Sequence, residues 1–152
     1  MSRKKPADDY LTDVEFRAWH GCLLFTNGAT RALDEAIVAA HGISLKEFDV
    51  LITLFNAPDR RLRMTELAER VILTPSGVTH LVTRLEREGL VSRIVDEQDR
   101  RSNFASLTRA GDRRLRESRS THNEVVRAQL TRRLTAAQLS ALGELWETIL
   151  EP

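Results

Sequence analysis

The sequence predicts a mainly α-helical protein that carries one small β-hairpin. Apolar residues recur at helical spacing through most of the 152-residue chain. A strand, turn and strand pattern occurs in residues 91–107, around the charged turn 96–102. Two short helices with clear boundary residues come directly before this hairpin. Helix, turn, helix and β-ribbon in this order predict a winged helix-turn-helix, with further helices on both sides of it.

The composition is that of an ordinary folded protein. Hydrophobic residues make up 41% of the chain, charged residues 30%, and the net charge is +1. The charge is uneven, because residues 60–114 hold 12 arginines against 8 acidic residues. Cys22 is the single cysteine, so no intrachain disulfide can form and a reducing compartment fits. With no long apolar run and no secretory signal, we expect a cytoplasmic protein that spans no membrane.

The first 43 residues predict a tail and one long helix. Residues 1–9 are polar and are expected to be disordered, whereas residues 11–40 carry an apolar stripe at helical spacing. Gly42 is suited to the left-handed conformation that ends a helix. Ser44 and Glu47 are spaced as a capping box for a second helix, which runs to about Asn56. Residues 61–63 are compatible with a short strand.

Residues 65–89 predict the helix-turn-helix itself. A short helix begins at Thr65, and Thr74 caps the next helix. Pro75 lies in the first turn of that helix, where a missing amide hydrogen costs nothing, and Gly89 ends it. The stripe predicted to be buried is Val78, Leu81, Val82 and Leu85. By subtraction, the residues that face outward are Ser76, Gly77, Thr79, His80, Thr83, Arg84 and Arg87.

Two further helices are predicted after the hairpin. Thr108 is placed to cap a long polar helix that continues to about Arg133. Thr135 and Gln138 form another capping box, which opens a final helix with apolar residues through Ile149.

The outward face of the second short helix suits DNA. Small polar residues near a helix N-terminus allow close approach to phosphates, which the helix dipole favours. Arg84 can grip a guanine through paired donors, and an arginine of the hairpin turn can enter the minor groove. The alternative is that Arg84 and Arg87 are solvated surface residues. The residues predicted to bind DNA are Thr65, Thr74, Pro75, Ser76, Gly77, Thr79, His80, Thr83, Arg84, Arg93, Arg100, Arg101, Ser102 and Asn103.

These residues give the chain a resemblance to the MarR family of bacterial transcriptional regulators. The strongest motifs are 65–68 (TELA), 76–79 (SGVT), 84–91 (RLEREGLV), 96–102 (DEQDRRS) and 107–111 (LTRAG). The resemblance implies a dimer whose first and last helices interlock, a near-palindromic operator in double-stranded DNA, and repression relieved by a small ligand. It assigns the minor-groove role to Arg100 or Arg101, without deciding between them.

The apolar stripes of the terminal helices independently favour a homodimer. One small winged domain cannot bury both helices, although packing against each other within one chain is the alternative. The predicted division is therefore a dimerisation helix over residues 10–43, a winged helix-turn-helix over 44–110 and dimerisation helices over 111–152, in one compact chain. A two-fold dimer places two recognition helices roughly 34 Å apart, about one turn of DNA.

The effector is the least determined part of the sequence. In relatives, phenolic or other aromatic anions often bind between the dimerisation helices and the DNA-binding domain. By this resemblance Trp19, His20, Leu23 and Asp49 are candidate pocket residues, although core or surface positions are the alternative for each. A urate-responsive subgroup uses an arginine in the recognition helix. The aligned residue here is Leu81, which argues against urate.

Cys22 raises the possibility of redox sensing, because peroxide sensors of this family carry a reactive cysteine on the first helix. Those sensors support it with tyrosines, whereas this chain has Tyr10 alone. We therefore interpret Cys22 as a buried structural residue. The histidines lack the spacing of metal ligands, and no cofactor motif is present. With no enzymatic motif either, the rival classes are a protein-interaction winged helix and, less well supported, an enzyme.

Overall fold

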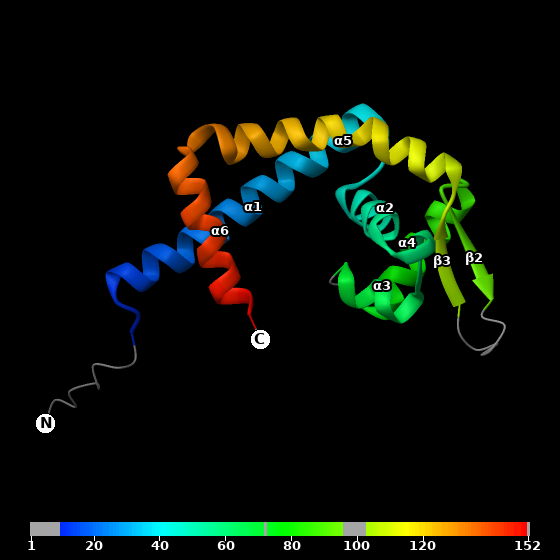
Figure 1. Ribbon diagram of the computed structural model, residues 1–152, viewed down its shortest axis with the longest axis horizontal. Coiled ribbons are helices and arrows are strands. Elements are labelled where there is room, and N and C mark those ends of the chain that lie inside the picture. Colours follow the sequence, from blue (N-terminus) through cyan, green and yellow to red (C-terminus); the bar gives the residue numbers. More distant parts are fainter. Residues whose placement is uncertain (1–9, 72, 96–102, 152) are drawn as a thin grey trace, which may run out of the picture.

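The computed structural model describes residues 10–71, 73–95 and 103–151. Figure 1 shows a winged head, built from α2, α3, α4 and the sheet, from which α1, α5 and α6 extend to one side. The predicted tail 1–9 and the hairpin turn 96–102 lie outside the described residues. In chain order the elements are α1 (Asp13–His41), α2 (Leu45–Asn56), the 3₁₀ turn η2 (Pro58–Arg60), β1 (Arg61–Arg63), α3 (Met64–Arg70), α4 (Pro75–Arg87), β2 (Val91–Val95), β3 (Asn103–Leu107), α5 (Arg109–Gln129), the 3₁₀ turn η3 (Thr131–Arg133) and α6 (Ala136–Leu150).

The three strands form one antiparallel sheet in the order β1-β3-β2. The predicted hairpin pairs Val91 with Leu107 and Val95 with Asn103. The short strand predicted at residues 61–63 is present and joins the outer side of β3, where Leu62 lies opposite Ala105. Both residues are buried, so the sheet covers one side of the core. The predicted fold class is confirmed.

The helix ends are mostly those that the sequence predicts. Ser44 and Thr135 each head a complete capping box, and Thr108 accepts a hydrogen bond from the Gly111 amide. Gly42 and Gly89 adopt left-handed conformations with φ of 69° and 70°. These values favour glycine because a side chain is strained there.

Several helix boundaries differ from the prediction. The helix predicted to begin at Thr65 begins one residue earlier, at Met64, and the first helix ends at His41 rather than at Ala40. The first helix begins at Asp13 rather than at residue 11, because Thr12 and Glu15 form a capping box that was not predicted. The helix predicted to reach Arg133 ends at Gln129, and residues 131–133 form a separate 3₁₀ turn.

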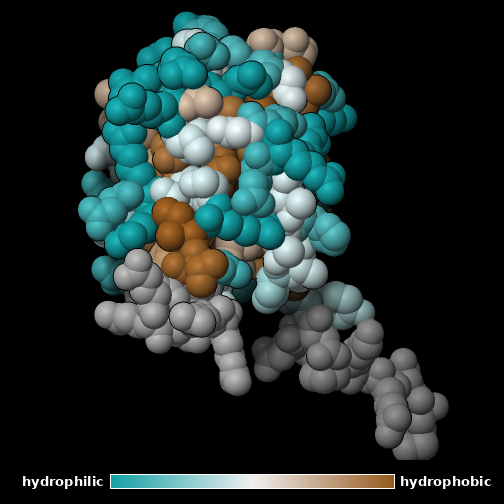
Figure 2. Space-filling view, turned by 90° about the vertical axis from the view of Figure 1, so that its right-hand side faces the viewer, coloured by the Kyte–Doolittle hydropathy of each residue, from teal (hydrophilic) through white to brown (hydrophobic). Residues whose placement is uncertain are grey.

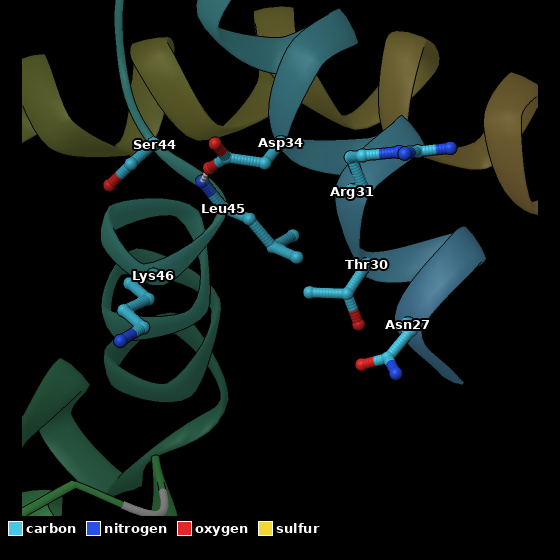
Figure 3. A pocket seen from close by; sticks show the side chains of 7 residues that line it. All are labelled: Asn27, Thr30, Arg31, Asp34, Ser44, Leu45 and Lys46. Carbon is cyan, nitrogen blue, oxygen red and sulfur yellow. Dashed lines mark hydrogen bonds between the residues drawn. The ribbon is translucent and has the colours of Figure 1, made fainter. Parts of the chain in front are cut away.

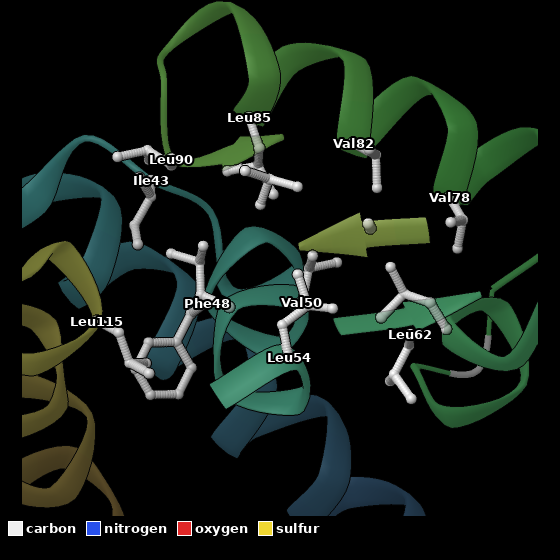
Figure 4. Packing of buried hydrophobic residues seen from close by; sticks show 14 of the residues in the cluster. Ile43, Phe48, Val50, Leu54, Leu62, Val78, Val82, Leu85, Leu90 and Leu115 are labelled. Carbon is white, nitrogen blue, oxygen red and sulfur yellow. The ribbon is translucent and has the colours of Figure 1, made fainter. Parts of the chain in front are cut away.

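The hydrophobic core lies between α2, α4 and the sheet. Figure 4 shows Val78, Val82 and Leu85 on α4 directed at the side chains of α2 and the strands. Leu81, the fourth residue of the predicted stripe, is half-buried at the edge of this cluster. Leu115 of α5 also belongs to the cluster, so the core fixes both the orientation of α4 and the start of α5.

The C-terminal end of α1 is tied to α5. The Arg114 guanidinium donates a hydrogen bond to the His41 carbonyl at 2.9 Å, and the His41 ring lies 2.8 Å from the Thr121 hydroxyl. The Asp34 carboxylate accepts a hydrogen bond from the Leu45 amide at 2.8 Å, which joins α1 to the first turn of α2. These contacts connect the winged head to the long helices.

The outer parts of α1 and α6 leave many apolar side chains exposed. Ile37 is the buried residue of α1, and α6 has none. The large hydrophobic residues exposed on these two helices are Val14, Phe16, Trp19, Leu23, Leu24, Phe25, Val38, Leu145, Trp146, Ile149 and Leu150. In the described part of the chain, no helix combines the length and the apolar character needed to cross a membrane.

Candidate nucleic-acid interface

The first turn of α4 is built from small residues around a threonine cap. The Thr74 hydroxyl accepts a hydrogen bond from the Gly77 amide at 3.1 Å and lies 3.1 Å from the Ser76 hydroxyl. A Cβ atom on Gly77 would lie 3.2 Å from the Thr74 hydroxyl oxygen, so glycine gives this cap its room. Thr74, Pro75 and Ser76 are exposed. The helix therefore presents amide groups and small side chains at its N-terminus, as an anion-binding end requires.

The face of α4 opposite the core is polar and exposed. Ser76, Thr79, His80, Arg84 and Arg87 all lie on it, as predicted. Two other residues of the predicted outward set, Gly77 and Thr83, are instead half-buried. Thr83 is partly covered because α4 runs beside β2, which brings a side chain of the hairpin over it. The exposed face is consequently narrower than the sequence alone indicates.

Arg93 of β2 folds onto α4. Its Nη2 atom donates hydrogen bonds to the Thr83 hydroxyl at 2.6 Å and to the Thr79 carbonyl at 3.2 Å. Its Nε atom is buried without a hydrogen bond and lies 3.7 Å from a carboxylate oxygen of Glu86. The guanidinium that was predicted to reach DNA thus joins the hairpin to α4. A DNA contact by Arg93 remains a prediction.

Arg84 lies between two carboxylates. Its Nε atom is 2.9 Å from Oε1 of Glu47 on α2 and 3.3 Å from Oε1 of Glu88. The Glu47 side chain is fully buried, whereas that of Arg84 is 57% exposed. From its spacing to Ser44, Glu47 is predicted only as part of a helix cap. No local signal reveals its pairing with Arg84, because the two residues belong to different helices.

The sheet adds further arginines near the hairpin. The guanidinium groups of Arg61 and Arg63 on β1 lie over the ring of Phe104, 5.3 Å and 5.2 Å from its centre. Figure 2 shows that the face of the molecule at this end is largely hydrophilic. Thr65 and Asn103 are exposed, as their predicted roles require. Arg100 and Arg101, the candidate minor-groove residues, lie outside the described residues, as does Ser102, which was also predicted to bind DNA.

The structure does not bring the predicted effector residues together. Trp19 and Leu23 are exposed on the outer half of α1, and the His20 ring stacks on Phe16 at 5.2 Å between centres. Asp49 lies on α2, where burial raises the pKa of its carboxyl and the charge of His122 on α5 lowers it. Along α1, His20 is roughly 21 Å from the turn that contacts α2. One pocket cannot contain all four residues of a single chain.

A cavity does lie between α1 and the start of α2. Its volume is about 520 Å³. Figure 3 shows Leu45 and Lys46 on one side, Asn27 and Thr30 on the other, and Asp34 bonded to the Leu45 amide. The lining residues are Asn27, Thr30, Arg31, Asp34, Ser44, Leu45 and Lys46. This cavity lies where the long helix α1 meets the winged head. Its lining residues were not predicted, because the polar side chains on α1 follow no pattern that distinguishes them from a solvated surface.

Cys22 lines a different, apolar cavity of about 350 Å³. Its walls come from α1, α6 and Leu130, with Trp146 among them, and none of the lining side chains is basic. Cys22 is half-buried rather than buried as predicted, because it lines the cavity between α1 and α6. In the described part of the chain, His, Cys, Asp and Glu do not gather into groups of three that can hold a metal ion.

Comparisons with known proteins agree with this architecture. The family model of the MarR family matches residues 43–102. The HTH-type transcriptional repressor YetL of Bacillus subtilis is 33% identical over 118 residues, which cover 76% of this chain and 71% of that protein.

Solved structures match over nearly the full chain. A MarR family transcriptional regulator from Streptomyces coelicolor, in complex with DNA, is 34% identical with a TM-score of 0.86, covering 94% of this chain and 92% of that one. AbsC from the same organism is 30% identical with a TM-score of 0.84, covering 92% and 94%. The chain belongs to the MarR family of transcriptional regulators, which is a non-enzymatic class of proteins.

Proposed function

We propose that this protein is a dimeric, sequence-specific DNA-binding repressor that acts in the bacterial cytoplasm. The observation that carries the proposal is the polar, exposed face of α4, which the core holds rigidly beside the hairpin. The similar Streptomyces coelicolor regulator, solved in complex with DNA, supports a DNA partner, and the name of YetL supports repression.

Each part of the surface has a distinct role in this proposal. The small residues Thr74, Pro75, Ser76 and Gly77 let the N-terminus of α4 approach phosphates. Thr79, His80 and Arg84 read base edges in the major groove. Arg100 or Arg101 enters the minor groove, whose narrow shape concentrates negative potential. Arg93 acts through α4, since its guanidinium already bonds Thr79 and Thr83.

The exposed apolar faces of α1 and α6 form the dimer interface in this proposal. Trp19 and Ile149 are 60% and 65% exposed in the single chain. Apolar patches of this extent usually mark an interaction site, and a second copy of the same chain covers both helices at once. The resulting two-fold axis suits a near-palindromic operator.

The cavity between α1 and α2 is the effector site that we propose in place of the residues predicted from sequence. Lys46 supplies a positive charge for a small anion, and Leu45 an apolar surface for an aromatic ring. A ligand there lies at the joint between the dimerisation helices and the winged head. The apolar surroundings of Cys22 favour a structural role over redox sensing, because nothing basic among them stabilises a thiolate.

Gel-shift assays with the DNA beside the protein's own gene test the DNA-binding proposal. We expect a specific shift that Arg100→Ala or Arg101→Ala weakens strongly while the dimer stays intact. A winged helix used for protein contacts would give no shift with any genomic fragment. Unchanged affinity in both arginine variants would refute the minor-groove assignment alone.

A further inference from the structure

Glu47 is a buried acidic residue whose two oxygens have different surroundings. Its Oε2 atom accepts hydrogen bonds from the Ser44 amide at 2.7 Å and the Ser44 hydroxyl at 2.9 Å. Its Oε1 atom is buried without a hydrogen bond, 2.9 Å from Nε of Arg84. One oxygen therefore caps α2, while the other faces an arginine of the recognition helix.

Helix capping does not account for this arrangement. Three other capping boxes occur in the described part of the chain, and in those of α1 and α6 the equivalent positions are held by Glu15 and Gln138. Both of those residues are exposed, and Gln138 caps its helix without a charge. A buried carboxylate without a counter-charge is costly. The burial of Glu47 beside Arg84 therefore points to a role beyond the cap.

Arg84 is held by one edge of its guanidinium group. The carboxylates of Glu47 and Glu88 both lie close to the Nε atom. Within the described residues, Arg84 donates its side-chain hydrogen bond from Nε to Glu88. Its two Nη atoms donate no hydrogen bond within the described part of the chain, and the side chain is 57% exposed. A guanine accepts two parallel hydrogen bonds at O6 and N7. The Nη edge is thus left available for such a base.

We propose that Glu47 is a positioning residue that sets the DNA sequence preference by fixing the direction of Arg84. Glu47 does not touch DNA in this account. Its carboxylate holds the Nε atom of Arg84 from the α2 side, so that the planar guanidinium group keeps one orientation before DNA binds. Less side-chain freedom is then lost on binding. The inference rests on the proposed function, because it requires α4 to read base pairs.

The test compares operator DNA with copies that carry single base-pair changes, using fluorescence anisotropy. Glu47→Gln removes the charge that faces Arg84. We expect it to lower the discrimination against one base-pair change about tenfold, the size of one bidentate contact. Affinity for unrelated DNA should stay the same, since phosphate contacts are untouched. Glu15→Gln, the same change in the capping box of α1, is the matched control and should keep full discrimination.

Arg84→Lys completes a double-variant cycle. Lysine keeps a positive charge near Glu47 but has no planar fork, so it should lose discrimination at the same base pair. Combining it with Glu47→Gln should cause little further loss of discrimination, because both changes remove the same interaction between Glu47 and Arg84. Fully additive losses would overturn the proposal, as would a folded Glu47→Gln protein with the discrimination of the wild type.

Two further results separate the possible failures. If Glu47→Gln does not fold, Glu47→Asp keeps the charge but shortens its reach, and wild-type discrimination in that variant would overturn the proposal. If the wild-type protein itself shows no preference among DNA sequences, the proposed function fails rather than the role of Glu47 alone.

Discussion

At Gly111 the backbone of α5 passes directly against the hairpin. A Cβ atom at this position would lie 2.1 Å from the Leu90 carbonyl oxygen, which is closer than real Cβ atoms approach any other atom. The Leu90 carbonyl also accepts hydrogen bonds from the amide and hydroxyl of Thr108. Glycine at position 111 therefore allows the first turn of α5 to pack directly against the backbone at the start of β2, a junction called the α5–β2 corner below.

Replacing Gly111 with alanine should destabilise the protein by about 3 kcal/mol, the upper end of the cost of overpacking. The matched control is Gly143→Ala, because open space surrounds Gly143 within α6. That change should be neutral or stabilise by about 0.5–1 kcal/mol, since alanine is the better helix former. Denaturant unfolding measures both values. Equal stabilities of the two variants would contradict this account of the α5–β2 corner.

Asp49 makes the stability depend on pH. Burial raises the pKa of its carboxyl above the ordinary value, so the folded protein favours the neutral form and the ionised form costs stability at neutral pH. Asp49→Asn should therefore increase the free energy of unfolding at pH 7. The gain should shrink as the pH falls towards the ordinary pKa of aspartate, because the Asp49 carboxyl of the folded wild-type protein then becomes protonated and, like asparagine, carries no charge. A gain that is constant from pH 7 to pH 3 would exclude this cause.

The sequence allowed good prediction of residues whose partners are local. The caps at Ser44, Thr74 and Thr108 depend on atoms three residues away, so spacing alone identifies them. In contrast, Arg84 is paired with Glu47 from another helix, and Thr83 with Arg93 from a strand. Such pairs depend on how elements pack, which no local pattern encodes.

At the scale of elements, the hairpin and the recognition helix are joined by a side-chain contact. Arg93 on β2 donates to the hydroxyl of Thr83 on α4. The contact joins α4, which we propose lies in the major groove, to the hairpin, whose arginines we propose enter the minor groove. The two elements that we propose to read DNA are thus joined by this hydrogen bond.

Thr83→Val should weaken this connection. Valine has a similar shape but cannot accept the hydrogen bond from Arg93, so the free energy of unfolding should fall by about 1 kcal/mol. Thr79→Val is the control, because the Thr79 hydroxyl bonds only the Pro75 carbonyl within the described chain. Its effect on unfolding should be smaller. A larger loss of unfolding free energy in Thr79→Val than in Thr83→Val would show that the hydrogen bond between Arg93 and Thr83 contributes nothing to stability.

The effector pocket shows where prediction from element patterns stops. The outer half of α1 is apolar on more than one side, so its sequence does not say which side faces α2. Trp19 and Leu23 were assigned to a pocket, yet they lie on an exposed face of that helix. The cavity beside α2 is lined mainly by ordinary polar residues, which the sequence does not distinguish from a solvated surface.

For the whole molecule, the dimer that we propose accounts for the absence of buried residues on α6 in the single chain. Ile149→Glu places a charge within the proposed interface and should shift the protein from dimer to monomer in sedimentation velocity. Ile94→Glu is the control, because Ile94 is an exposed apolar residue of β2, away from α1 and α6. It should leave the dimer intact. A dimeric Ile149→Glu protein, or a monomeric wild type, would contradict the interface.

The most direct test of the central claim is the affinity of the wild-type protein for its operator across a range of salt concentrations. Fluorescence anisotropy with labelled DNA from beside its own gene gives both the affinity and the stoichiometry. We predict two protein chains for each near-palindromic site and an affinity that falls steeply and linearly on logarithmic axes, because phosphate contacts release counterions. Equal affinity for operator and unrelated DNA, or an affinity that does not change with salt, would contradict the claim that α4 and the hairpin read DNA.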